Sequence, residues 1–213
     1  MDIIIEFLPQ MLEGFGVTLK IFALTLILSI PLGIIIALGR LSKIKIIKYI
    51  TGVYVLIMRG TPLMLQIIFI FFGLPLLKMN INRFPAAILA LVLNYGAYFA
   101  EIFRAGIQSI DKGQYEGAEV LGISGKDTFF RIILPQAFKR ILPPVSNEVI
   151  TLVKDTALIY VVGIDELLKV GTIALNRTSS LLPLVIVGLI YLCFIAILTK
   201  VLAKVEEKFN YYQ

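Results

Sequence analysis

The sequence contains no histidine, no tryptophan and a single cysteine, Cys193. Without histidine, catalysis by an imidazole base and metal binding by imidazole are both excluded. A single cysteine forms no disulfide within the chain. Charged residues are also scarce, at 16% of 213 residues, which is below the share in an ordinary soluble domain.

Apolar residues are abundant instead, at 59% of the chain with a mean hydropathy of +0.94. This composition places the chain in a lipid bilayer, where each spanning helix takes about 20 residues. We therefore expect an all-α polytopic membrane protein that forms one domain over residues 1–213 and has about five spans. The predicted spans are about 17–39, 49–77, 84–103, 141–164 and 178–199.

The second predicted span is too long for an unbroken helix. As a straight helix, residues 49–77 would measure about 43 Å at 1.5 Å per residue, which exceeds the thickness of the bilayer core. Pro62 lacks a backbone donor and disfavours a continuous helix. We expect a break at Gly60-Thr61-Pro62 and a restart at Pro62 with Thr61 as cap, which leaves free amides that can accept an anion.

Basic residues predict the orientation. The first connection contains four cations and no acid, and such clusters stay on the cytoplasmic side. These cations are Arg40, Lys43, Lys45 and Lys48. We expect a plasma (inner) membrane protein with its N-terminus outside, its C-terminus in the cytoplasm and segment 105–140 in the cytoplasm. The net charge of +6 then faces cytoplasm and anionic lipid, and no basic-aromatic pattern indicates a nucleic-acid partner.

Segment 105–140 is unusually long beside the other connections, and loops of this length usually carry function. Residues 115–121 fit a short amphipathic helix that Gly122 ends, and a second helical stretch from about Lys126 is expected to end at Leu134-Pro135. Two interpretations are open from these residues alone. The loop is either a docking platform for a partner or an elbow that only connects two spans.

Several ordered motifs in the chain resemble those of a known family. Glu116-Gly117-Ala118, Gly122, Ile132 and Leu134-Pro135 fall in the register of the Glu-Ala-Ala signature of permease subunits of ATP-binding-cassette importers. Gly117 departs from the signature, which has alanine there, and glycine weakens a helix by about 1 kcal/mol. Further stretches resemble the polar amino acid branch, so that the likeness covers about residues 14–203. They are Arg59–Leu63, Tyr98–Arg104, Gly113-Gln114 and Asn147–Thr156.

The resemblance implies that the chain is a transport subunit and not an enzyme. In that family the loop is a coupling helix, so residues 115–135 would contact an ATPase. The glycines of Gly117–Gly122 have phosphate-loop spacing, but Ile123-Ser124 stands where lysine and a hydroxyl residue are required. ATP and Mg would therefore bind to the partner, and this chain would need no cofactor. The implied partners are two ATPase subunits, a second permease chain that is either identical (a homodimer) or a paralogue, an extracytoplasmic substrate-binding protein and an amino acid solute.

Polar side chains inside the predicted spans mark a candidate solute path, because charges there are costly. Asn94, Tyr98 and Glu101 are spaced i, i+4, i+7 on one face of the third span. On the fourth span, one face carries Glu148, Thr151 and Asp155. Plainer roles are also open: Glu101 can pair with Arg104, and Asp155 with Arg59 or a helix terminus.

We expect the solute site to consist of Arg59, Thr61, Asn94, Tyr98, Glu101, Asp155 and Thr156. The restarted half-helix would accept the α-carboxylate, while the acids and polar groups would take the ammonium. The resemblance implies a polar amino acid, and the acids alone extend this to a basic solute such as arginine, lysine or histidine. No metal site is expected, since Asp165-Glu166 has no further ligands and fits a cap or a solvated outer loop.

Two other functions compete with this prediction. A self-sufficient secondary carrier would have a small frame at five spans without an evident inverted repeat. A membrane-embedded lipid-modifying enzyme would need clustered acids or a nucleophile beside a base, whereas the acids here are scattered over different spans. Dependence of uptake on ATP would distinguish the importer from the carrier.

Overall fold

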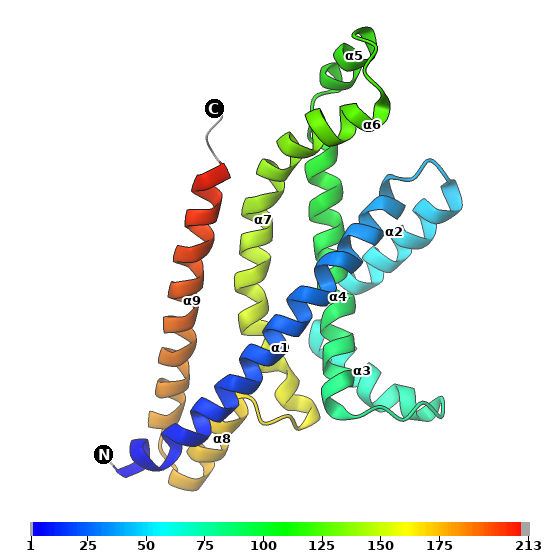
Figure 1. Cartoon of the computed structure of the whole chain (residues 1–213). Coiled ribbons are helices and arrows are strands. Elements are labelled where there is room, and N and C mark those ends of the chain that lie inside the picture. Colours follow the sequence, from blue (N-terminus) through cyan, green and yellow to red (C-terminus); the bar gives the residue numbers. More distant parts are fainter. Residues whose placement is uncertain (1, 210–213) are drawn as a thin grey trace.

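The computed structural model describes residues 2–209, and its regular structure in that range is entirely helical (Figure 1). The all-α prediction is confirmed. In chain order the elements are α1 (Asp2–Leu41), α2 (Lys45–Gly60), α3 (Leu63–Leu76), α4 (Arg83–Gln108), α5 (Lys112–Val120), α6 (Gly125–Asp127), the π-helical η1 (Thr128–Ile133), α7 (Leu134–Asp155), the 3-10 helix η2 (Thr156–Val162), α8 (Leu167–Thr178) and α9 (Leu182–Phe209).

The centre of the fold is the crossing of α1 and α4, which contact each other more extensively than any other pair of helices. Close packing depends on small residues, since a Cβ added at Gly33 of α1 would lie 2.7 Å from the Cβ of Phe99 on α4. The main core lies here: Leu91, Tyr95 and Phe99 are at most 1% exposed and pack against Leu152 of α7. Helix α4 is therefore the scaffold against which the other helices are positioned.

The predicted break in the second span is confirmed. Helices α2 and α3 meet at an angle of 106° across Thr61-Pro62. The predicted cap is wrong, however, because the Thr61 hydroxyl donates to the carbonyl of Ile57 at 2.8 Å and is thus committed to the helix before the break. Pro62 occupies the N-cap position of α3, where no side chain caps the helix.

The number of spans is not fixed by helix length and composition. Within residues 2–209, three helices are long and apolar enough to cross a membrane: α1 from Phe7, α4 and α9. The bent α2–α3 pair makes a fourth if it counts as one span. Helix α7 carries Arg140, Glu148, Lys154 and Asp155, so its role as a fifth span stays a prediction.

Several helix ends differ from those predicted. Helix α4 continues to Gln108, α7 starts at Leu134 and α9 extends to Phe209, so the connection between α4 and α7 is shorter than 105–140. The predicted fourth span is α-helical only to Asp155 and then tightens into η2. Helix α8, which was not predicted, fills the expected outer loop. Among these elements, α8 starts at a side-chain cap, Glu166, whereas α7 starts without one.

Leu134-Pro135 was predicted to end a helix, and this is wrong. Both residues lie in the first turn of α7, which continues from η1 without a gap. Pro135 forgoes one backbone bond to the preceding turn, where the Leu134 amide donates to the carbonyl of Phe129, five residues earlier. The wider turn of η1 immediately before it gives the chain room to continue past the proline ring.

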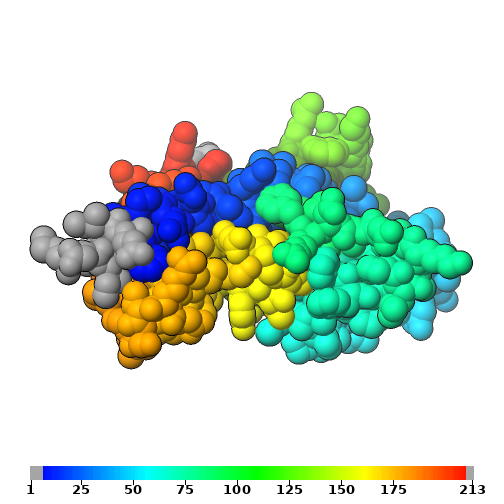
Figure 2. All heavy atoms as spheres, turned by 90° about the horizontal axis from the view of Figure 1, so that it is seen from below, coloured from blue at the N-terminus to red at the C-terminus, as the bar shows by residue number. Residues whose placement is uncertain are grey.

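The elements are distributed between two ends of the molecule. Helices α5 and α6 and the C-terminal end of α9 lie at one end, whereas α8 and the N-terminal part of α1 lie at the other (Figure 1). Figure 2 shows the second end, where α8, η2 and α3 lie side by side. The segment between α4 and α7 therefore projects from the end opposite to α8.

Candidate functional site

A cavity of about 440 Å³ lies against the break between α2 and α3 and is closed by α4 and α7. This volume is in the usual range for small-molecule sites. Its lining consists of Arg59, Gly60, Thr61, Pro62, Leu63, Asn94, Tyr95, Tyr98, Glu148, Thr151 and Asp155. Residues far apart in the sequence, among them Arg59, Tyr98 and Asp155 of the predicted solute site, thus share one cavity.

Two buried amides hold the break open on one side of the cavity. The Gln66 Nε2 donates to the carbonyl of Met58 at 2.9 Å and to the hydroxyl of Thr61 at 2.8 Å. The Asn94 Nδ2 donates to the same Met58 carbonyl at 2.9 Å and to Gln66 Oε1 at 3.0 Å. These bonds satisfy a carbonyl that the break leaves without a helical partner. Gln66 was not among the predicted site residues, although a lone amide in the apolar run of α3 was a usable signal.

The opposite wall carries negative charge. Glu148, Thr151 and Asp155 of α7 all line the cavity, so the predicted shared face is present. The Tyr95 hydroxyl donates to Asp155 Oδ2 at 2.7 Å, and Tyr95 is almost fully buried. The sequence did not predict this contact.

Arg59 does not pair with Asp155. No ion pair of Arg59 occurs in the part of the chain that the structure describes, and its guanidinium lies 5.1 Å from the centre of the Tyr98 ring. Arg59 is exposed, so an incoming anion can reach its guanidinium beside the ring.

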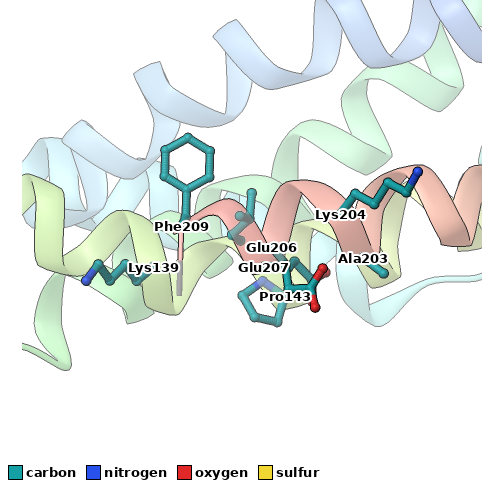
Figure 3. Close-up of a pocket in the computed structure, with 8 residues that line it drawn as sticks. Lys139, Pro143, Ala203, Lys204, Glu206, Glu207 and Phe209 are labelled. Carbon is teal, nitrogen blue, oxygen red and sulfur yellow. The ribbon is translucent and has the colours of Figure 1, made fainter. Parts of the chain in front are cut away.

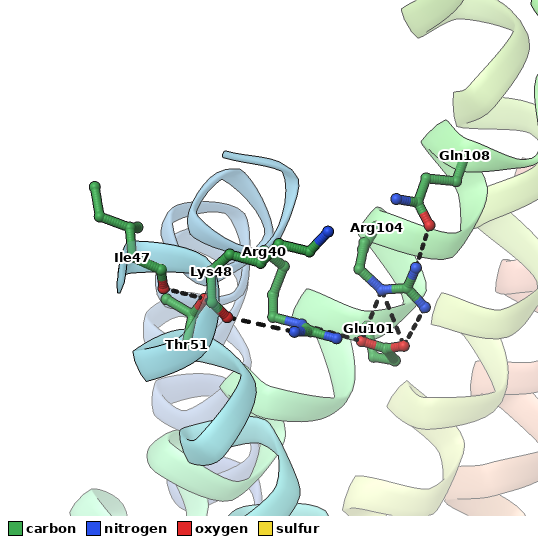
Figure 4. A network of polar contacts seen from close by, with 7 residues as sticks. All are labelled: Arg40, Ile47, Lys48, Thr51, Glu101, Arg104 and Gln108. Atoms are coloured by element: carbon green, nitrogen blue, oxygen red, sulfur yellow. Dashed lines mark hydrogen bonds and ion pairs between the residues drawn. The ribbon is translucent and has the colours of Figure 1, made fainter. Parts of the chain in front are cut away.

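Two residues of the predicted solute site lie outside the cavity lining. Glu101 accepts from Arg104 Nε at 3.0 Å on both oxygens and lies 3.9 Å from Arg40 Nε (Figure 4). Its pairing with Arg104, the plainer of the two roles foreseen, is confirmed. Thr156 is 0% exposed, and its hydroxyl donates to the carbonyl of Val153 at 2.7 Å. Local helix contacts thus occupy both side chains.

A second hollow of about 470 Å³ adjoins the first and shares Arg59, Gly60 and Tyr98 with it. Arg40 and Glu101 contribute the other charges of its lining. Because Glu101 follows Tyr98 along α4 toward Gln108, this hollow continues toward the end of the molecule that carries α5. The Arg59–Tyr98 contact thus lines both spaces.

The predicted short helix between α4 and α7 is present as α5. Asp111 caps its start by accepting from the amide of Gly113 at 2.7 Å. At its end, Gly122 has φ +71°, its amide donates to Glu119 at 2.9 Å and the Ile123 amide donates to Ala118 at 2.9 Å. This pair of bonds is a Schellman motif, so the predicted stop at Gly122 is confirmed.

The surface of α5 is suited to contact another protein. Glu116 and Gly117 are exposed, whereas Ala118 faces inward at 3% exposure. Val120 and Leu121, at 86% and 77% exposed, form an apolar tip that the sequence analysis did not single out. Apolar side chains this exposed at the end of a projecting helix favour a docking role over a simple elbow.

Further hollows lie near the start of α7 and the end of α9. One of about 400 Å³ lies between the two helices and is lined by both charge signs, with Lys139, Lys204 and Glu207 around Pro143 (Figure 3). Leu134 and Pro135 line another, of about 650 Å³, on the side of Phe209. None of the residues predicted to bind solute lines either hollow.

The predicted cap at Asp165-Glu166 is present. The Glu166 side chain is 0% exposed and accepts from the amides of Leu168 and Lys169 at 2.8 and 2.7 Å, which starts α8. Burial raises the pKa of the Glu166 carboxyl above 4.5, and the two amides partly oppose this. Among the side chains that the structure describes, residues 7–209, no group of three or more His, Cys, Asp or Glu could hold a metal.

Comparison with known proteins shows which proteins this chain is similar to. The family model described as "Binding-protein-dependent transport system inner membrane component" matches residues 29–210. The arginine transport system permease protein ArtQ of Bacillus subtilis (strain 168) is 43% identical over 94% of this chain and 93% of its own length. The L-cystine transport system permease protein TcyB of the same organism is 36% identical, over 97% and 89%. The putative glutamine transport system permease protein GlnP of Rickettsia prowazekii (strain Madrid E) is 34% identical, over 96% of each chain.

Solved structures agree with these relatives. A crystal structure of an amino acid ABC transporter with histidines contains a chain that matches with a TM-score of 0.91 and 36% identity, covering 96% of both chains. An inward-facing MetNI methionine ABC transporter matches with a TM-score of 0.71 at 17% identity, which supports the fold alone. The relatives are transport subunits and not enzymes. The chain is therefore a membrane-embedded transport subunit that belongs to the family of binding-protein-dependent transport system inner membrane components.

Proposed function

We propose that this chain is the permease subunit of an ATP-driven importer for amino acids, and that the cavity at the α2–α3 break is its solute site. The relatives named for arginine, cystine and glutamine transport support the amino acid class. The expected assembly contains a second copy of this chain, two ATPase subunits that bind ATP and Mg, and an extracytoplasmic substrate-binding protein. Two identical permeases would complete the pathway as a homodimer.

The charges of the cavity match both ends of an amino acid. Arg59 and the first amides of α3, which no side chain caps, can accept the α-carboxylate. Glu148 and Asp155 stand on the opposite wall and can accept an ammonium. Asn94 and Thr61 line the same space, but their hydrogen bonds to the break make them positioning groups for Arg59 and α3.

The pair of carboxylates carries the proposal that the solute is basic. A neutral amino acid carries one positively charged group, its α-ammonium, whereas arginine, lysine or protonated histidine carries a second one on its side chain. Glu148 and Asp155 can neutralise both, and a charged group leaves water for the membrane interior only when it is paired. Because Asp155 is already oriented by Tyr95, it is the better fixed of the two acids.

Uptake measurements test this specificity. The chain would be reconstituted into proteoliposomes with its ATPase and binding protein, and ATP-driven uptake of labelled arginine and glutamine would be compared. Asp155→Asn and Glu148→Gln should each lower arginine uptake at least tenfold, with a smaller effect on glutamine. Glu207→Gln, which removes an exposed acid on α9, is the matched control. Unchanged arginine uptake in both cavity variants would exclude these carboxylates from the site.

We also propose that α5 and the adjoining turn couple the permease to the ATPase. The segment 115–135 projects from one end of the molecule, and the exposed Val120 and Leu121 offer an apolar contact to a cleft in the partner. Glu116, Gly117, Ala118 and Gly122 lie in this helix and its stop, whereas Leu134 and Pro135 begin α7 and join the coupling segment to the cavity wall. Movement of α5 would thereby reach Glu148 and Asp155.

A further inference from the structure

A shallow groove on the outer surface of the α1–α2 corner belongs neither to the solute cavity nor to the coupling segment. Its volume is about 470 Å³, and its lining combines cations with an aromatic and an apolar part. The lining residues are Arg40, Lys45, Lys48, Tyr49, Gly52, Val53 and Leu56. Three cations and no carboxylate therefore face one groove.

The guanidinium of Arg40 is placed in this groove by the backbone of α2. Its Nη1 donates to the carbonyl of Lys48 at 3.5 Å, and a Cβ added at Gly52 would lie 2.7 Å from the same nitrogen. The Nε of Arg40 is buried without a hydrogen-bond partner. Gly52 thus provides the floor on which the guanidinium rests, with its Nη1 over α2 and its buried Nε on the side of Glu101, 3.9 Å away.

The remainder of the groove is apolar. Val53 and Leu56 are 36% and 71% exposed, and Tyr49 is 69% exposed beside the lysines. The corner also joins the end of the long apolar helix α1 to α2, so its cations lie where an apolar span ends. A ligand with an anionic head and an apolar chain complements this arrangement in both charge and polarity.

We propose that the groove at the α1–α2 corner binds an anionic phospholipid, with its phosphate against Arg40, Lys45 and Lys48 and an acyl chain along Val53 and Leu56. The site does not depend on which solute is transported. Only its assignment to the cytoplasmic leaflet rests on the proposed orientation. The headgroup phosphate, free phosphate and other small anions share the chemistry that the cations recognise, and the apolar part of the groove selects the lipid.

The site adjoins the charge network around Glu101. Arg40 Nε lies 3.9 Å from Glu101, which also pairs with Arg104 (Figure 4). A phosphate on Arg40 competes with Glu101 for the same guanidinium. Bound lipid would therefore change the charge contacts in the second hollow beside the solute cavity, which Arg40 and Glu101 both line.

Native mass spectrometry of the full chain in detergent tests the proposal. The purified protein would be incubated with phosphatidylglycerol, phosphatidylcholine, inorganic phosphate or glycerol 3-phosphate. We expect selective retention of phosphatidylglycerol, and a loss of about tenfold or more in its affinity for the double variant Lys45→Gln/Lys48→Gln. The matched control Lys200→Gln/Lys208→Gln removes the same charge from α9 and should bind as the wild type does.

A variant that keeps every charge separates a built site from general attraction. Gly52→Ala places a methyl group against the guanidinium of Arg40, whose flexible side chain can move aside, so the fold is retained while the donor is displaced. Its phosphatidylglycerol affinity should fall several-fold at an unchanged melting temperature. Equal retention of phosphatidylcholine, equal losses in both double variants, or competition by free phosphate at the affinity of the lipid would each overturn the proposal.

Discussion

A single buried carboxylate, Glu166, joins three parts of the molecule. It accepts two amides of α8, the Tyr191 hydroxyl of α9 donates to it at 3.1 Å, and the Thr18 hydroxyl of α1 accepts from the adjacent Leu167 amide at 3.3 Å. A sequence assigns a cap to such a residue from its position before a helix. The burial that makes the cap costly to remove is decided by α1 and α9, which are remote in the chain.

Glu166 should make stability depend on pH. Burial raises the pKa of the Glu166 carboxyl above 4.5. Between pH 4.5 and the raised pKa, the folded protein therefore binds more protons than the unfolded chain does. Stability from this group is complete below pH 4.5 and falls as the pH rises through the raised pKa. Melting temperatures in detergent should therefore decline with rising pH more steeply for the wild type than for Glu166→Gln. The exposed Glu119→Gln should follow the wild type, and parallel curves for all three proteins would contradict the expectation.

Gln66 offers a second prediction about one side chain. Gln66→Met keeps the size of the side chain and removes its bonds to Met58 and Thr61, which leaves the Thr61 carbonyl without its side-chain donor and the Asn94 amide without one of its two acceptors. Each unsatisfied buried group costs about 1–3 kcal/mol, so the variant should melt at a clearly lower temperature. Gln10→Met, at an exposed position of α1, is the control. Equal melting of the two variants would show that the break does not depend on Gln66.

At the scale of elements, the proposed contact of α5 with the ATPase depends on the end of this helix at Gly122. A side chain at Gly122 meets no atom within 4 Å, so Gly122→Arg carries only the backbone strain of a non-glycine residue at φ +71°, about 1–3 kcal/mol, while its bulk would keep α5 from a close contact with the ATPase. We expect uptake below about a tenth of wild type, with normal membrane levels. Gly122→Asn is the control, because asparagine tolerates positive φ. Proteoliposome uptake and pull-down of the ATPase measure both effects, and full uptake by the arginine variant would refute the coupling role.

Charge on the same helix gives a separate test. Glu116 is exposed, and Glu116→Lys reverses its charge without disturbing a buried contact. Association with the ATPase should weaken several-fold and should depend more strongly on salt concentration than in the wild type, because exposed charges are screened by salt. Glu207→Lys on α9 controls for the change in net charge. The affinity for the ATPase is measured by titration at two salt concentrations, and equal affinities for the two variants would exclude Glu116 from the contact.

The elements that the sequence predicts well are those with local causes. Pro62 removes a helical donor at the α2–α3 break, and Gly122 ends α5 because positive φ suits glycine, so both features are present as expected, although the prolines inside α1 and α7 do not break those helices. Features set by packing were missed or misplaced. Thr156 is turned inward by η2, and α8 forms where a loop was expected, whereas the local pairing of Glu101 with Arg104 was one of the two roles foreseen. Tyr95 escaped notice because a buried tyrosine in a span looks like core until its partner, Asp155, is placed beside it.

At the scale of the whole molecule, the proposed function requires an external energy source. The two hollows beside the break share Arg59 and Tyr98, which contact each other, and we expect solute passage to need a movement of α2 against α4 that the proposed partner would drive. Solute uptake should therefore require both the ATPase and ATP. Proteoliposomes that contain this chain alone, with an imposed proton or sodium gradient, should accumulate no arginine. Accumulation in that control would favour a secondary carrier.

The orientation of the molecule decides whether α5 can reach an ATPase at all. Val120 on the α5 tip and Asn176 on α8 are both exposed and lie at opposite ends of the fold, and Cys193 can be replaced so that one introduced thiol remains. In a Cys193→Ser background expressed without the ATPase, Val120→Cys should react with a membrane-impermeant maleimide in inverted vesicles only, because the basic α1–α2 corner holds that end in the cytoplasm. Asn176→Cys should react in intact cells only. The reverse pattern would place α5 outside the membrane, where no ATP is hydrolysed, and the coupling role would be lost with it.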